Sequence, residues 1–349
     1  MDNFSQLRHA CKHFGGEMML DNKGIPSVYV PFKSVQSKTL IETDSEAVHP
    51  AFIISGRQID EIYIGKYHGL LYYGCAHSIP FETPAFLLDW DDALRSCEEK
   101  GAGYHMLTLA EWALIGLNCY KEGFFPKGNN DYGRDIAEAE YPGIPCSYED
   151  DGRVRHILEG TGTQEYFHNG SISGVWGMNG NVAQWIAGYR TVNGEIQIIA
   201  DNNAAASVYQ NAESTLWRAI RPDGSLVSPG SGDTLHWNWL DGKITLDTES
   251  TDEDGAGVYT SAFSELAVNT SNVGDRVPDI LKALALFPDG EGSYGCATRT
   301  VCLKGERVAA AGGGYGDGSD AHVLSLNASF TRNEVSTAVG VRLAYCKMY

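Results

Sequence analysis

The C-terminal stretch GGGYGDGSDAHVLSLNASFTRNEVSTAVGVR spans residues 312–342. Glycine, serine and aspartate dominate its first third, and short apolar runs follow. Glycine and small polar residues favour turns, whereas short apolar runs favour brief strands. The same alternation of turn-forming residues and short apolar runs extends through most of the chain. The chain holds 40 glycines and 18 tyrosines in 349 residues and few long periodic segments. The sequence therefore predicts short strands joined by many shaped loops.

Two segments upstream predict helices that face a core. In residues 88–97, Trp90, Ala93, Leu94 and Cys97 fall at helical spacing, and Asp89 precedes them as a helix N-cap. Thr108 followed by Glu111 has the spacing of a capping box, in which side chain and backbone of the two residues bond reciprocally. It opens the apolar segment LAEWALIGLNC.

Strands are expected in two other segments. Residues 50–74 are rich in isoleucine and tyrosine, which favour strands. In residues 190–199, Asn193-Gly194 stands between two β-forming runs, and this dipeptide is the strongest short signal for a β-hairpin.

Charge and hydropathy exclude several classes of partner. The chain carries 26 basic and 45 acidic residues, a formal net charge of −19, whereas nucleic-acid and anionic-membrane binders cluster Lys and Arg. It has no run of about 18 apolar residues, so no membrane insertion is expected. The N-terminus lacks the pattern of a signal peptide, and we expect the protein to be made in a bacterial cytoplasm. Its eight cysteines are then expected to be reduced, mostly buried thiols.

Three separated segments carry a resemblance to a known family. They are Glu111-Trp112, the run WGMNGNVAQW at 176–185, and Arg307–Tyr315 with Val339–Arg342. In this order they resemble the formylglycine-generating enzyme (sulfatase-modifying factor) version of the C-type lectin fold. The resemblance implies an α+β fold with short strands, two helices and much irregular structure. It runs from about residue 50 to the end and is interrupted at 201–295.

The resemblance does not extend to the enzyme's chemistry, because a fold does not fix a function. The positions that match the family's copper-binding cysteines hold Asp317 and His322, and neither can form a thiolate. The His-x-x-x-His-x-Glu arrangement of an iron-dependent branch is not found. We therefore expect no enzymatic activity, no catalytic residue and no cofactor.

Three groups of residues resemble metal sites, and none of them is favoured as one. Cys296 and Cys302 fit no Cys-x-x-Cys spacing, and Asp317, Asp320 and His322 share one glycine-rich loop. The family's calcium segment keeps Asn181 but has Gln184 at its acidic position, which lowers the charge of the ligand set. For this segment we expect a structural role, with Trp176 and Trp185 in the core and Gly180-Asn181 in a tight turn.

The 312–342 stretch resembles a second group more closely. Variable proteins of diversity-generating retroelements, phage tropism determinants among them, end in a segment of the same spacing, and the match runs without a gap from Gly312 to Arg342. The departures fall where the group places asparagines, whose codons are randomised at adenines. The residues found there can all be reached from asparagine codons, whereas Glu334 cannot. These departures are Gly316, Asp317, Asp320, Ser329 and Phe330.

This second resemblance implies a receptor-binding protein, encoded by a phage or prophage, that recognises a host-cell surface protein or glycan. Side chains that point to solvent from shaped loops can vary without unfolding the scaffold, and Tyr, Ser, Gly and Asp are typical of adaptable binding surfaces. The predicted ligand-binding residues are Tyr315, Gly316, Asp317, Ser319, Asp320, His322, Ser329, Phe330 and Arg332.

The expected organisation is an N-terminal segment at 1–24 and a C-type lectin-like domain at 25–349. The domain contains a long insertion at 201–295 and the variable-type region at 312–342. The resemblance also implies association with a virion, as in a phage tail, and leaves attachment or homo-oligomerisation as a trimer open for residues 1–24. Two alternatives remain: a metal-dependent oxidase or oxygenase of the enzyme family, and a structural virion protein that binds nothing.

Overall fold

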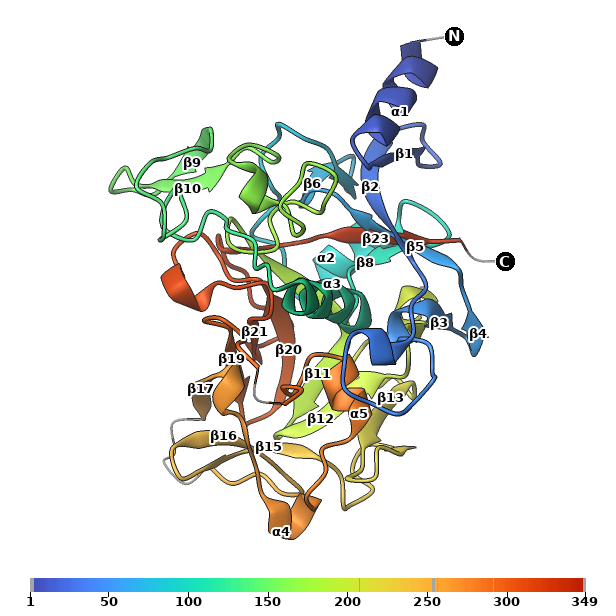
Figure 1. Ribbon diagram of the computed structural model, residues 1–349, viewed down its shortest axis with the longest axis vertical. Coiled ribbons are helices and arrows are strands. Elements are labelled where there is room, and N and C mark those ends of the chain that lie inside the picture. The colour runs from blue at the N-terminus through green and yellow to red at the C-terminus, as the bar shows by residue number, and fades with distance from the viewer. Residues whose placement is uncertain (1–2, 207, 253–254, 256, 291, 348–349) are drawn as a thin grey trace.

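The fold is known from a computed structural model that describes residues 3–206, 208–252, 255, 257–290 and 292–347 (Figure 1). Two larger β-sheets hold most of its strands. The first sheet draws strands from both ends of the chain, because its last strand β23 lies between β5 and β8. Its strand order is β1 (Glu17–Leu20), β2 (Pro26–Lys33), β5 (Glu61–Gly65), β23 (Leu343–Cys346) and β8 (Tyr104–Met106).

The second sheet has 12 strands and supports the C-terminal stretch. Its main order is β17 (Val258–Ala262), β19 (Thr298–Cys302), β21 (Leu326–Phe330), β20 (Glu306–Ala311), β11 (Ala183–Val192), β12 (Glu195–Ile199), β15 (His236–Leu240), β16 (Lys243–Asp247) and β18 (Ala267–Val268). The short strands β13 (Trp217–Ile220), β14 (Leu226–Val227) and β22 (Val339–Gly340) pair at its side. Three further two-stranded pairs are β3 (Ile53–Ile54) with β4 (Arg57–Gln58), β6 (Gly69–Tyr72) with β7 (Cys75–Ser78), and β9 (Pro145–Tyr148) with β10 (Val154–Ile157).

The helices are few. In the described residues they are α1 (Asn3–His13), α2 (Trp90–Glu98), α3 (Leu109–Glu122), α4 (Thr270–Val273) and α5 (Asp279–Ala283). Short 3-10 turns lie at Ser37–Thr39, Pro50–Phe52, Gln164–Tyr166, Asn203–Ala206, Phe263–Glu265 and Gly318–Asp320. The predicted α+β class, with short strands and two core-facing helices, is confirmed. None of the described helices combines the length and apolar character that a membrane crossing requires.

The local predictions for the two main helices are also confirmed. The Asp89 carboxylate accepts a hydrogen bond from the backbone N–H of Asp92 at the start of α2. At α3, Thr108 and Glu111 form both bonds of the capping box. Figure 1 shows α3 at the centre of the molecule, between the sheet that contains β5 and β23 and the sheet that contains β11 and β20. Its apolar faces fill the largest core cluster, in which Trp112 and Ile115 are fully buried.

The Asn193-Gly194 hairpin forms where it was predicted. Val192 of β11 pairs with Glu195 of β12, which leaves the two residues as the turn. Both have positive φ, 49° at Asn193 and 82° at Gly194, as a type I′ turn requires. The tight turn at Gly180-Asn181 has positive φ at both residues as well. Trp176 and Trp185 are fully buried, as expected.

The structure places the expected segments as follows. Residues 17–20 of the N-terminal segment form β1 and pair with β2, so this part shares a sheet with the domain. The 201–295 insertion supplies β13 to β18 along with α4 and α5. All eight cysteines are free thiols, and five of them are buried.

Candidate functional site

The 312–342 stretch winds over the second sheet and is held by backbone hydrogen bonds on both sides. Within it lie the 3-10 turn Gly318–Asp320, β21 and β22. The backbone N–H of Gly180 donates to the carbonyl of Gly312 (3.1 Å), and that of Ala183 donates to Ala338 (2.8 Å). On the other side, Tyr132 donates to Tyr315 (2.8 Å). The loop is therefore fixed at several points.

This stretch borders a cavity of about 520 Å³. The floor is aliphatic, the walls carry hydroxyl and amide groups, and two carboxylates complete the lining. The volume lies within the usual range of ligand pockets, about 300–1,000 Å³. The lining residues are Ala183, Thr260, Thr298, Thr300, Ala310, Gly313, Gly316, Asp317, Asp320, Ser325, Leu326, Asn327, Phe330, Ser336, Ala338 and Val339.

Four of the predicted ligand-binding residues line this cavity: Gly316, Asp317, Asp320 and Phe330. Both aspartates are exposed. The Asp317 carboxylate accepts a hydrogen bond from the backbone N–H of Gly314 at 2.8 Å. Phe330 is half-buried, and its ring meets Trp185 edge to face with a centroid separation of 5.2 Å. The core thus sets the position of the one aromatic ring in the lining.

Five predicted residues do not line the cavity, and three of them are Ser319, Ser329 and Arg332. Ser319 is exposed, and the Ser329 hydroxyl donates to Asn327 Oδ1 at 2.7 Å. Arg332 is half-buried and already paired: its guanidinium lies 3.1 Å from Asp91, 3.2 Å from Glu306 and 4.3 Å from the centre of the Trp90 ring. These contacts tie the stretch to the scaffold.

The expectation of solvent-facing side chains is wrong for Tyr315 and His322, which are only 7% and 3% exposed. The Tyr315 hydroxyl donates to the Glu149 carboxylate and lies 2.9 Å from the Thr337 hydroxyl. Burial and the Glu149 carboxylate raise the pKa of Tyr315, because both disfavour a phenolate. His322 packs edge to face on Phe125 at 4.4 Å, and burial lowers its pKa to about 4. Both residues act as anchors beneath the loop.

Residues 130–148 lie next to the 312–342 stretch, and the sequence did not predict them as part of the site. Asn130 accepts a hydrogen bond from the backbone N–H of Gly318 (2.8 Å), and a Cβ added at Gly316 would lie 2.9 Å from the Tyr132 hydroxyl. Exposed large apolar residues continue along this segment, namely Ile136, Tyr141, Ile144 and Tyr148. Exposed aromatic residues in loops of tyrosine and glycine are the signal that would have pointed here.

Two threonines of the cavity lining, Thr260 and Thr300, were missed as well. Thr260 lies on β17, which belongs to the 201–295 insertion, and Thr300 lies on β19. Their hydroxyls are 2.9 Å apart across the paired strands. The insertion therefore contributes to the cavity.

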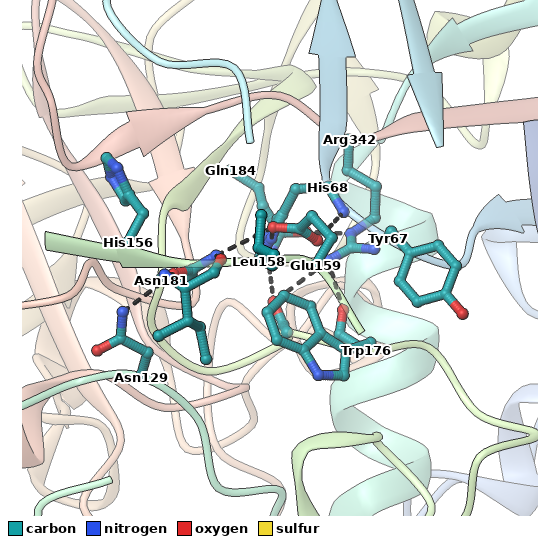
Figure 2. Close-up of polar contacts among 12 residues, drawn as sticks. Tyr67, His68, Asn129, His156, Leu158, Glu159, Trp176, Asn181, Gln184 and Arg342 are labelled. Atoms are coloured by element: carbon teal, nitrogen blue, oxygen red, sulfur yellow. Dashed lines mark hydrogen bonds and ion pairs between the residues drawn. The ribbon is translucent and has the colours of Figure 1, made fainter. Parts of the chain in front are cut away.

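A buried polar network surrounds Arg342, the last residue of the 312–342 stretch, and Figure 2 shows its members converging. Arg342 is fully buried; its guanidinium donates to Gln184 Oε1 (2.6 Å) and to the carbonyls of Gly65 (2.7 Å) and Trp176 (2.8 Å). Burial lowers the pKa of Arg342 to about 9. The side-chain oxygen of Gln184 is thus bound to protein donors, as the structural interpretation of this segment predicts.

Glu159 is the carboxylate of this network. Its Oε1 lies 3.0 Å from His68 Nδ1 and accepts a hydrogen bond from Asn181 Nδ2, also at 3.0 Å. Asn181 Oδ1 in turn accepts from Asn129 Nδ2 and from the backbone N–H of Ile157, each at 3.0 Å. Throughout the described ranges, no three His, Cys, Asp or Glu side chains gather in a way that could hold a metal ion.

Comparison with known proteins gives structural likenesses only. No family model matches the sequence, and no curated protein matches it. Among solved structures, the chain is similar to Treponema denticola variable protein 1, with a TM-score of 0.37 and 12% identity over 95% of this chain and 98% of that one. It is also similar to PvdO from Pseudomonas aeruginosa, with a TM-score of 0.32 and 14% identity over 95% and 98% of the two chains. At such TM-scores function has to come from the geometry of this chain's own residues.

Proposed function

We propose that this protein is a non-enzymatic, ligand-binding variable protein of a diversity-generating retroelement, encoded by a phage or prophage. Its C-terminal region would recognise a protein or glycan on the host-cell surface. The observation that carries the proposal is the cavity, because four residues predicted from the sequence as variable or ligand-binding meet in its lining. The group's spacing over 312–342 is the second support.

The pattern of burial suits a surface whose exposed residues vary in sequence while the buried residues preserve the fold. Asp317, Ser319 and Asp320 are exposed, whereas Tyr315 and Ala321 on either side are buried. A substitution at an exposed loop position changes stability little, while a buried position is sensitive to shape. The exposed residues of this loop can therefore vary with little cost to the fold.

The chemistry of the lining favours binding over catalysis. Its side chains are hydroxyls, one amide, two carboxylates, aliphatic groups and one aromatic ring, and none of the lining residues is a cysteine or a histidine. A redox or nucleophilic reaction of the enzyme family needs a thiolate or a comparable group. We propose further that the protein is carried on a virion, with residues 1–24 available for attachment or trimer formation.

The genetic arm of the proposal is tested at the gene's own locus. A reverse transcriptase gene is expected nearby, together with an imperfect repeat of the segment that encodes 312–342. The mismatches between repeat and gene should fall at adenines of the repeat. A locus without such a repeat would refute the retroelement origin.

The binding arm is tested with purified protein on a panel of bacterial cells. Thr300→Tyr fills the cavity from the half-buried face of β19, and the control Tyr209→Ser alters a side chain that is 86% exposed and outside the lining. On cells that bind the unchanged protein, Thr300→Tyr should bind at least about tenfold more weakly, equivalent to about 1.4 kcal/mol. The control should bind these cells normally. Equal binding by all three proteins would overturn the proposal.

A further inference from the structure

The residues that line the cavity at the 312–342 stretch favour a positively charged ligand. Two of its lining residues, Asp317 and Asp320, carry carboxylates, and none of the lining residues is Lys, Arg or His. The chain as a whole carries a net charge of −19. Anionic groups such as phosphates or sialic acids would meet repulsion here, whereas a cation would be attracted.

The floor of the cavity is apolar. Ala183, Ala310, Leu326 and Val339 come from four strands of the second sheet, β11, β20, β21 and β22. Small aliphatic side chains leave room for a narrow apolar chain and favour its burial. A cation with a hydrated surface on all sides would gain nothing from such a floor.

The walls supply hydrogen-bond acceptors. The hydroxyls of Thr260 and Thr300 lie 2.9 Å apart, and the Ser325 hydroxyl accepts from the backbone N–H of Thr298 at 3.0 Å. A hydroxyl has two acceptor lone pairs, so the two threonine hydroxyls can still accept. The Asp317 carboxylate uses Oδ2 for the Gly314 N–H and has Oδ1 for a further donor. An ammonium brings three donors and a guanidinium five.

We infer that the cavity binds a basic side chain, lysine or arginine, presented by the host-surface protein. This inference rests on the proposed function and names the chemistry of its ligand. An apolar stem beneath a charged head is what lysine and arginine offer, and such residues bury the stem while the head stays near water. The stem would lie on the aliphatic floor and the head between the hydroxyl wall and the two exposed aspartates.

A neutral sugar fits the same cavity less well. Sugar recognition relies on hydrogen bonding with an aromatic face, and the lining holds one aromatic ring, Phe330, whose orientation is set by the edge-to-face contact with Trp185. The hydroxyls alone would not distinguish a sugar from water. Binding of a neutral glycan is therefore an outcome that counts against the inference.

The experiment uses the full chain and four probes in ligand-observed NMR titrations. The probes are the N-acetyl amides of arginine, lysine, citrulline and norleucine. Citrulline matches arginine in shape without the charge, and norleucine matches the lysine stem. We expect the arginine or the lysine probe to bind at least about tenfold more tightly than its neutral counterpart, and this preference should shrink with added salt because the aspartates are exposed.

Two sets of variants assign the effect to the cavity. The double variant Asp317→Asn and Asp320→Asn should reduce binding of the charged probes to that of the neutral ones, while Asp44→Asn, an exposed carboxylate outside the lining, should leave it unchanged. Thr300→Tyr keeps both carboxylates but fills the cavity, so it should prevent binding of all four probes. Thermal melts of each variant verify folding.

Failure of the inference can be told apart from failure of the function. If Thr300→Tyr abolishes cell binding while the double asparagine variant binds cells and probes normally, the cavity recognises a ligand that is not cationic, and the inference falls alone. Equal binding of citrulline and arginine, or tight binding of a neutral glycan that ignores both aspartates, would overturn it as well. If Thr300→Tyr leaves cell binding intact, the proposed function falls.

Discussion

The Tyr315 hydroxyl donates a hydrogen bond to the Glu149 carboxylate and so joins the C-terminal stretch to the β9–β10 pair. Arg155 lies 2.9 Å from the same carboxylate, and together with Tyr315 it lowers the pKa of Glu149 to about 2. The carboxylate therefore stays charged at any physiological pH. A residue expected at the binding surface thus holds the loop in place from beneath.

Tyr315→Phe removes this bond and keeps the ring. The free energy of unfolding should fall by about 1 kcal/mol, the usual net value of one hydrogen bond. Ligand binding should change less than stability, because Tyr315 does not line the cavity. Urea denaturation and the cell-binding assay measure the two effects. A loss of binding with unchanged stability would instead assign Tyr315 to the ligand contact.

Two glycines of the loop should differ sharply when replaced by alanine. Gly313 has φ of +75°, and a Cβ there would lie 2.5 Å from the Cβ of Ala321, so Gly313→Ala should cost more than about 2 kcal/mol. At Gly316 the nearest atom is the terminal hydroxyl of Tyr132, which can move. Gly316→Ala should cost less than about 1 kcal/mol. Denaturation of both variants under one condition tests the contrast, and equal costs would contradict it.

Replacement of Arg342 by methionine should be severe. The buried guanidinium donates to Gln184 Oε1 and to three backbone carbonyls, and methionine cannot replace these hydrogen bonds. The free energy of unfolding should fall by about 3–5 kcal/mol. Arg57→Met serves as the control, because Arg57 is exposed. A loss below about 1 kcal/mol at Arg342 would show that water or a local shift replaces the donors.

Acid should destabilise the protein through its buried histidines. Burial lowers the pKa to about 4 for five of them: His49, His77, His156, His168 and His322. Because the unfolded chain binds these protons at the ordinary pKa of about 6.5, the stability they contribute is complete above that pH and is lost as the pH falls from about 6.5 towards 4. Urea midpoints at several pH values should decline across this window. A flat profile would argue against burial of neutral imidazoles.

His105 should respond in the opposite direction. Burial alone would lower its pKa, but the Glu111 carboxylate, 2.8 Å from Nε2, holds the pKa well above the usual value. Its contribution to stability is therefore complete below about pH 6.5 and disappears as the pH rises through the folded pKa. His105→Gln should lose more stability at pH 6 than at high pH. A loss that does not vary with pH would mean that His105 is neutral in the fold.

Local chemistry explains which parts of this fold could be predicted from sequence. The Asp89 and Thr108 caps and the Asn193-Gly194 turn depend on residues a few positions apart, and each forms as expected. The burial of Trp176 and Trp185 follows from their size and from the pattern around them. These features could be predicted because each depends mainly on residues that are close together in the sequence.

The candidate site could be predicted only in part. Asp317 and Phe330 line the cavity as expected, but Thr260 and Thr300 line it too, on strands whose pairing brings residues 40 positions apart together. No local pattern encodes that pairing. The burial of Tyr315 was missed because an irregular loop has no period that separates an inner from an outer face.

The position of β23 has a consequence for biosynthesis. In the first sheet, residues 343–346 lie between β5 and β8 and pair with both, so these two strands are joined into one sheet only when those residues arrive. Pairings of such large sequence separation form slowly. A nascent chain that still lacks this strand would expose the edges of β5 and β8, and the emergence of residues 343–346, rather than that of the first strands, would set the moment at which this sheet closes.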